Sequence, residues 1–104
     1  MDTLQQAIFA YLQTIPRGKV VTYGQIGAHL GNRQLARAVG NALHRNPDGI
    51  KYPCYKVVNA AGKLSDNYAF GGIEAQKKRL EDDEITVING KVDLRMYQYC
   101  EGEV

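Results

Sequence analysis

The apolar residues at the start of the chain recur at helical intervals. Residues 4–15 carry a single apolar stripe made of Leu4, Ile8, Phe9, Leu12 and Ile15. This spacing predicts a helix with one buried face, and either Asp2 or Thr3 can cap its first turn. The proline and glycine within positions 15–19 predict that the helix ends there.

The next segment predicts a short helix with a defined start and end. After an extended pair at 20–21, Thr22 and Gln25 stand three positions apart, which is the spacing of a capping box. A helix is therefore expected over 23–30. Gly31 is expected to end it, because glycine readily adopts the left-handed conformation that closes many helices.

A second helix is expected over 33–45, with Asn32 as its cap. Its inward stripe consists of Leu35, Val39, Ala42 and Leu43. Its outward stripe consists of Arg33, Arg37, Asn41 and His44. Two short helices joined by a tight turn that contains glycine are typical of a helix-turn-helix.

One edge of this second helix carries almost no side chains, because Ala36 and Gly40 lie four positions apart. A bare edge lets the helix backbone approach another surface closely. That surface is either a neighbouring helix or a narrow nucleic-acid groove. In the second case, Arg37 is the side chain that projects into the groove.

The rest of the chain alternates short elements. We expect a strand at 55–58, a turn at 60–62, a loop at 65–72, a polar helix at 73–83 and a hairpin formed by 85–88 and 91–94. The hairpin is predicted from Asn89-Gly90, a pair that suits the type I′ turn.

Composition and charge narrow the classes of function. A chain of 104 residues predicts a single domain over 1–104. Residues 1–63 carry eight basic and two acidic residues, whereas residues 64–104 carry five basic and nine acidic ones. A basic front and an acidic back suit a protein that presents one side to a polyanion, although chance clustering of solvated charge gives the same pattern.

The two cysteines, Cys54 and Cys100, are expected to be reduced thiols. We expect no metal site, because the chain lacks a CxxC motif and neither His29 nor His44 has ligand-like spacing to a cysteine. No signal-peptide pattern and no apolar run long enough to cross a bilayer is present in the sequence. These features predict a cytoplasmic protein that does not enter a membrane.

The segment Tyr52-Pro53-Cys54-Tyr55-Lys56-Val57-Val58 resembles the Pro-Cys-His-Arg-Val motif of the O6-alkylguanine-DNA alkyltransferases. Three further segments resemble this family in the same order: 21–26, then Gly31-Asn32 with 36–40, and Asn46-Pro47. The resemblance covers roughly residues 4–85. It implies an α+β, mainly helical, winged helix-turn-helix-like DNA-binding domain with a small β-hairpin, standing alone without the family's N-terminal domain.

The resemblance also implies a DNA-binding surface and a base pocket. In this family the recognition helix lies in the minor groove, an arginine fills the gap left by a flipped base, and a tyrosine crowds the phosphate of that nucleotide. Arg37 and Tyr23 match these two residues. The implied DNA-binding set is Tyr23, Ala36, Arg37, Gly40, Asn41 and Lys56. The implied alkylguanine pocket consists of Asn46, Pro53, Val57 and Tyr68, the last from a segment, 67–72, that resembles the family's Asn-Tyr-Ser-Gly-Gly loop with one inserted residue.

Cys54 matches the family's nucleophile, and a thiolate suits the displacement of an alkyl group from guanine O6. In the family, a histidine after the cysteine relays to a glutamate and raises the thiolate fraction. Here that residue is Tyr55, a poor base at neutral pH, and Asp83 falls near the relay acid, with Glu84 or Glu81 as alternatives. We therefore predict Cys54, Tyr55 and Asp83 as the catalytic set, with Lys56 and nearby backbone amides favouring the thiolate.

Three functions stay open at this point. The first, which the retention of Cys54 favours, is stoichiometric alkyl transfer from DNA to Cys54, without metal or cofactor. The second is a non-enzymatic protein that binds alkylated bases and flags them for other repair factors, with Cys54 lining the pocket or inert within the core. The third is a regulator that reads sequence in the major groove, which the bare edge and single projecting Arg37 disfavour. The expected partners are double-stranded DNA containing alkylated guanine and repair-pathway proteins, bound by a monomer.

Overall fold

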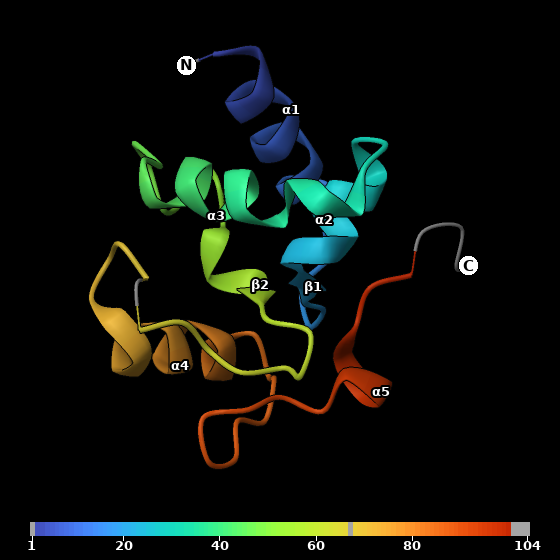
Figure 1. The fold of residues 1–104 in the computed structure, drawn as a ribbon. Coiled ribbons are helices and arrows are strands. Elements are labelled where there is room, and N and C mark those ends of the chain that lie inside the picture. The colour runs from blue at the N-terminus through green and yellow to red at the C-terminus, as the bar shows by residue number, and fades with distance from the viewer. Residues whose placement is uncertain (1, 67, 101–104) are drawn as a thin grey trace.

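The computed structural model describes residues 2–66 and 68–100 (Figure 1). Asn67, the first residue of the predicted pocket loop, lies outside them. The elements are α1 (Thr3–Leu12), β1 (Val21–Thr22), α2 (Tyr23–His29), the 3-10 helix η1 (Arg33–Leu35), α3 (Ala36–His44), the 3-10 helix η2 (Cys54–Lys56), β2 (Val57–Val58), α4 (Gly72–Asp82) and α5 (Leu94–Tyr97). The predicted mainly helical α+β class is confirmed.

Helix α1 begins with a complete capping box. The side chain of Asp2 accepts a hydrogen bond from the Gln5 amide at 2.8 Å, and the Gln5 side chain accepts one from the Asp2 amide at 3.2 Å. Asp2, and not Thr3, is therefore the N-cap. The helix ends at Leu12, earlier than predicted, yet Ile15 beyond its end is still buried in the core.

The helix-turn-helix forms much as the sequence predicts. The side chain of Thr22 caps α2 by accepting a hydrogen bond from the Gln25 amide at 3.0 Å. The turn after α2 is tight, since a Cβ on Gly27 would lie 2.7 Å from the carbonyl oxygen of Asn32. The predicted helix over 33–45 is divided: Leu35 has a ψ of 1°, so the first turn is the 3-10 helix η1 and α3 follows it.

Strands β1 and β2 pair in parallel, with Val21 opposite Val57 and Thr22 opposite Val58. Because the strands are parallel, η2, which carries Cys54 and precedes β2, lies at the end of the sheet where β1 begins. The predicted strand over 55–58 is wrong in its first half, because the Lys56 amide bonds to the Pro53 carbonyl and closes a 3-10 turn. In Figure 1 the two strands lie between the helices α1–α3 above and α4 below.

The predicted hairpin over 85–94 forms only its turn. Asn89 and Gly90 both have positive φ, 54° and 72°, as a type I′ turn requires. Instead of two strands there is one bridge between Ile88 and Lys91, and residues 91–92 pair with residues 62–63. The physical reason is Gly62, where a Cβ would lie 2.3 Å from the Val92 carbonyl oxygen, so that only glycine admits this close approach.

The core joins every long helix to the sheet. Its fully buried members include Ile8, Phe9, Leu12, Val21, Ile26, Val39, Val57 and Leu80. Within residues 2–66 and 68–100, no helix combines the length and apolar character needed to cross a bilayer.

Candidate functional site: a cavity between the helix-turn-helix and Cys54

A cavity of about 710 Å³ opens beside α3. One wall is the small-residue edge of α3 together with the first residue of α2. A second wall is the segment that contains η2 and β2. The third wall comes from α4 and the residues that precede it. The cavity thus lies where the helix-turn-helix meets the cysteine segment.

The α3 wall gathers five residues that the sequence assigned to DNA binding. Tyr23, Ala36, Arg37, Gly40 and Asn41 all line the cavity, and Arg37 and Asn41 are exposed. A Cβ added to Gly40 would meet the Tyr23 ring at 3.8 Å, which is ordinary contact. The bare edge therefore borders the cavity, with the Tyr23 ring in ordinary contact beside Gly40.

The second wall carries Cys54 and Val57, both buried and both lining the cavity. Asn46, predicted as a lining residue, lies behind this wall. Its Nδ2 donates to the Tyr52 carbonyl at 2.8 Å and its Oδ1 accepts from the Asp48 amide at 2.9 Å. Asn46 therefore holds the segment that leads to Cys54. Pro53 likewise does not line the cavity. It is the N-cap of η2, and its carbonyl accepts the Lys56 amide at 3.1 Å.

The third wall presents Tyr68, which is 8% exposed. Among the described residues, its hydroxyl has no hydrogen-bond partner although the oxygen is buried. Burial raises the pKa of Tyr68, so the hydroxyl keeps its proton at neutral pH. A buried hydroxyl without a partner costs free energy, and a ligand in the cavity would offer the missing acceptor.

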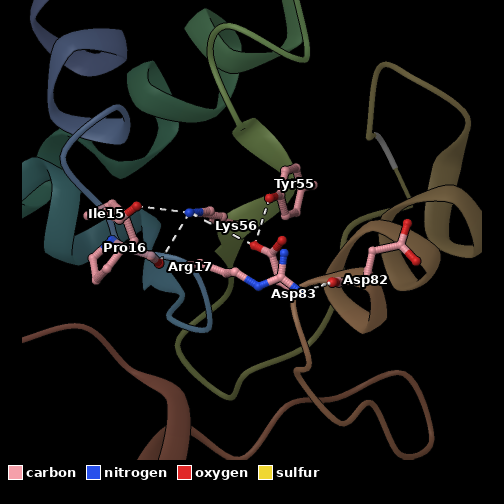
Figure 2. A network of polar contacts seen from close by, with 7 residues as sticks. All are labelled: Ile15, Pro16, Arg17, Tyr55, Lys56, Asp82 and Asp83. Carbon is pink, nitrogen blue, oxygen red and sulfur yellow. Dashed lines mark hydrogen bonds and ion pairs between the residues drawn. The ribbon is translucent and has the colours of Figure 1, made fainter.

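A network of polar contacts outside the cavity joins Tyr55, Lys56 and Asp83 (Figure 2). The Tyr55 hydroxyl donates to Asp83 Oδ2 at 2.7 Å. Lys56 Nζ donates to the carbonyls of Ile15 and Pro16 at 2.8 and 3.2 Å, and it lies 3.9 Å from Asp83 Oδ2. Of the three acids considered for a relay, Asp83 is thus the one that pairs with Tyr55.

This network corrects one sequence prediction. Lys56, expected to bind DNA, is 5% exposed and uses its ammonium group inside the protein. Tyr55 reaches Asp83 at the end of α4, and Lys56 reaches the carbonyls of the segment that follows α1. Tyr55 and Asp83 also do not line the cavity. Burial and the Asp83 carboxylate raise the pKa of Tyr55 well above its ordinary value, so this phenol does not accept a proton at neutral pH.

Burial also raises the pKa of the Cys54 thiol, while a hydrogen bond from Asn46 and the charge of Arg79 oppose this shift. The guanidinium of Arg79 lies 4.9 Å from the centre of the Tyr55 ring, so α4 supplies the cation near the cysteine. Lys56, expected from the sequence to favour the thiolate, is not among the causes of the shift. Burial outweighs these two contributions, so the pKa of Cys54 is raised and the thiol is mainly protonated at neutral pH.

The raised pKa predicts slow alkylation of Cys54 by iodoacetamide. A thiol with a raised pKa holds less thiolate at a given pH, so the rate should keep rising above the pH at which an ordinary thiol levels off. Exposed Cys100 is the internal comparator. Peptide mass spectrometry over pH 7–10 measures both rates, and equal rates at neutral pH would contradict the prediction.

Six further lining residues were not predicted: Leu43, His44, Arg45, Ser65, Ala69 and Gln76. The sequence placed His44 on the outward stripe, but no motif near it in the sequence indicated that it lines a pocket. Gln76 left a sequence signal, because it interrupts the apolar stripe of α4 one turn before Leu80. It is 1% exposed.

Comparisons with known proteins agree with this geometry. Residues 3–85 match the family model described as 6-O-methylguanine DNA methyltransferase, DNA binding domain. A Vibrio parahaemolyticus protein named DNA base-flipping protein is 41% identical over 100 residues, which cover 95% of this chain and 98% of that protein. The crystal structure of S. pombe Atl1 in complex with damaged DNA containing O6-carboxymethylguanine superposes with a TM-score of 0.86 at 30% identity, covering 96% of this chain and 97% of Atl1.

A longer relative is the bifunctional methyltransferase/endonuclease of Picrophilus torridus, which is 40% identical over 96 residues. These residues cover 92% of this chain but only 32% of that protein. The chain therefore spans about a third of the Picrophilus protein, whereas it matches the Vibrio protein and Atl1 over nearly their full lengths.

Proposed function

Because the chain belongs to the family of 6-O-methylguanine DNA methyltransferase DNA-binding domains, as its motifs predicted, we propose that it binds duplex DNA and holds a flipped O6-alkylguanine in the cavity beside Cys54. The observation that carries the proposal is the cavity itself. It is bordered on one side by the bare edge of α3 with Arg37 and on the other by Tyr68, whose hydroxyl has no hydrogen-bond partner within residues 2–66 and 68–100.

The α3 edge suits the first step, contact with the duplex. A helix enters a narrow minor groove only if its backbone comes close, and Ala36 and Gly40 leave room for that. Arg37 projects from the same edge and is exposed. We assign it to the gap that a flipped base leaves in the stack, and Tyr23 to the phosphate of that nucleotide.

The interior suits the second step, the holding of a purine. Taking a base out of the stack costs a few kcal/mol, which contacts in the pocket must offset. Tyr68 offers a hydrogen-bond donor with no competing partner among the described residues, and acceptor atoms on the ring edge of guanine can satisfy it. Val57 and Leu43 offer apolar contact to the base or its alkyl group.

Binding without repair is the function that the chemistry around Cys54 supports best. The Cys54 thiol is buried and has a raised pKa, so it is mainly protonated at neutral pH. The Tyr55 hydroxyl donates a hydrogen bond to the Asp83 carboxylate. Tyr55, which stands where the family has its histidine, therefore does not serve as the general base for the thiol. The Vibrio protein named for base flipping and Atl1, whose structure holds damaged DNA, are also matched over nearly their full lengths.

Alkyl transfer is the second candidate, and the position of Cys54 in the cavity wall favours it. The thiol would first lose its proton to water. The sulfur would then form the S–C bond as the C–O6 bond breaks, and guanine would leave with the electron pair on O6 and take up a proton at N1. The thioether would be permanent, so each molecule would act once.

The test compares the wild type with Cys54→Ser on duplexes that carry either O6-methylguanine or guanine. We expect both proteins to prefer the methylated duplex to the same degree, and the intact mass of the wild type to stay unchanged after incubation. A gain of one methylene unit that Cys54→Ser lacks would establish transfer instead. Equal affinity for the two duplexes would reject the proposal, and a preference for one unmodified sequence would favour a regulator.

The cytoplasmic location, the monomeric state and the recruitment of repair-pathway proteins, all expected from the sequence, stay predictions alongside this function. The same holds for a single domain over 1–104.

A further inference from the structure

We propose that Gln76 is a positioning residue of the cavity: its side-chain amide holds the wall that carries Cys54 and the wall that carries Tyr68 at a fixed separation. The proposal rests on the proposed function, since it concerns the pocket in which the flipped base would lie. Gln76 projects from α4 and lines the cavity between the two walls.

Gln76 binds both walls at once. Its Nε2 donates to the carbonyl oxygens of Tyr55 and Val57, both at 3.0 Å, which flank Lys56 in the cysteine segment. Its Oε1 accepts from the amide of Ser65 at 2.8 Å. One side chain thus uses both donor hydrogens and its acceptor, and joins the cysteine segment to the segment that begins at Ser65.

The Ser65 contact leads on to Tyr68 through the backbone. The Tyr68 amide donates to the Ser65 carbonyl at 3.3 Å, and the Gly72 amide at the start of α4 donates to the Tyr68 carbonyl at 3.0 Å. The backbone of Tyr68 is therefore hydrogen-bonded on one side to Ser65, which Gln76 binds, and on the other to the first turn of α4. A shift of Ser65 would move the Tyr68 hydroxyl relative to Cys54.

Burial makes this arrangement sensitive. Gln76 is 1% exposed, so water cannot replace a lost hydrogen bond there without entering the core. An apolar side chain of equal length would fill the space but leave two carbonyls and one amide without partners. The two walls would then be held only by packing, which fixes their spacing less well than directed bonds.

The experiment measures lesion preference in Gln76→Met, a variant of similar volume. Preference is the ratio of the dissociation constants for the guanine duplex and the O6-methylguanine duplex. We expect this ratio to fall about tenfold, the equivalent of one buried hydrogen bond, while affinity for the guanine duplex changes less than about twofold. Gln76→Glu keeps the acceptor for Ser65 but loses both donors, so it should also lower this ratio. It replaces Gln76→Met in the experiment if the methionine variant does not fold.

The matched control is Leu80→Ala, one turn further along the same face of α4. Leu80 is fully buried but does not line the cavity, so this variant should lose stability and keep its preference. A role of Gln76 in stability alone predicts that all three variants behave alike when compared at temperatures at which they are folded. That outcome would overturn the proposal.

A second measurement separates this proposal from the proposed function. In protein labelled with ¹³C on its tyrosine rings, Gln76→Met should shift or split the Tyr68 signal, assigned through Tyr68→Phe, whereas Leu80→Ala should leave it in place. If the wild type shows no lesion preference, the proposed function fails, and the Tyr68 signal alone decides the role of Gln76. An unmoved Tyr68 signal in Gln76→Met rejects the positioning role.

Discussion

Replacement of Arg37 by alanine is expected to lower the preference for an O6-methylguanine duplex about a hundredfold. The flipped state leaves a gap in the base stack, and the cost of unstacking is a few kcal/mol, so loss of the residue that fills the gap should cost a large share of that amount. Arg37 is the exposed cation on the bare edge of α3 that borders the cavity. Affinity for an unmodified duplex should fall much less, because it depends on summed phosphate contacts.

The matched control for this prediction is Arg33→Ala, which removes the same charge from the outward stripe of the helix-turn-helix. Arg33 is exposed and does not line the cavity, so its loss should weaken binding to both duplexes by the same factor. The measurement is a pair of titrations at one fixed salt concentration. A 2-aminopurine base placed beside the lesion adds a fluorescence signal for unstacking. If Arg37→Ala and Arg33→Ala give the same ratio and the same signal, Arg37 does not occupy the stack.

The parts of the fold that the sequence predicts well are those set by local hydrogen bonds. The capping pair Thr22–Gln25 defines the start of α2, and Asn32, whose side chain accepts from the Gln34 amide, caps the next turn. These contacts join residues two or three positions apart. Their geometry is therefore encoded within a few positions of the chain.

The predictions that were wrong depend on contacts between distant segments. Lys56 follows Cys54 by two positions, so the local sequence predicts that its side chain lies on the DNA-binding surface. Its direction is set instead by the η2 turn and by carbonyls some forty positions earlier, at Ile15 and Pro16. The hairpin failed for a similar reason, since Gly62 draws residues 91–92 into a different pairing.

The candidate site shows the same division. The α3 face, with Ala36, Arg37 and Gly40, follows from helical spacing and borders the cavity as expected. Ser65 and Gln76 could not be placed from the sequence, because their shared contact needs α4 to pack behind the cysteine segment. A polar residue on an otherwise apolar helical stripe was the signal that could have found Gln76.

Removal of the Asp83 carboxylate should be the most damaging change away from the cavity. We expect Asp83→Ala to lower the free energy of unfolding by about 3 kcal/mol, since it leaves the Lys56 ammonium without its nearest carboxylate and the Tyr55 hydroxyl without its acceptor. The side chains of Lys56 and Asp83 are only 7% and 12% exposed, so water compensates little. Urea unfolding followed by circular dichroism measures the change.

The control for Asp83 is its neighbour Glu84, which lies 3.9 Å from Arg17 in a pair whose side chains are 86% and 65% exposed. Glu84→Gln should cost under about 1 kcal/mol, because solvent screens an exposed pair. Adding Lys56→Met to Asp83→Ala should recover part of the loss, since the unpaired buried charge is then gone. If the double variant is as unstable as the sum of the two single variants, the two side chains act independently. The network of Figure 2 would then not be the link that fastens α4 to the segment after α1.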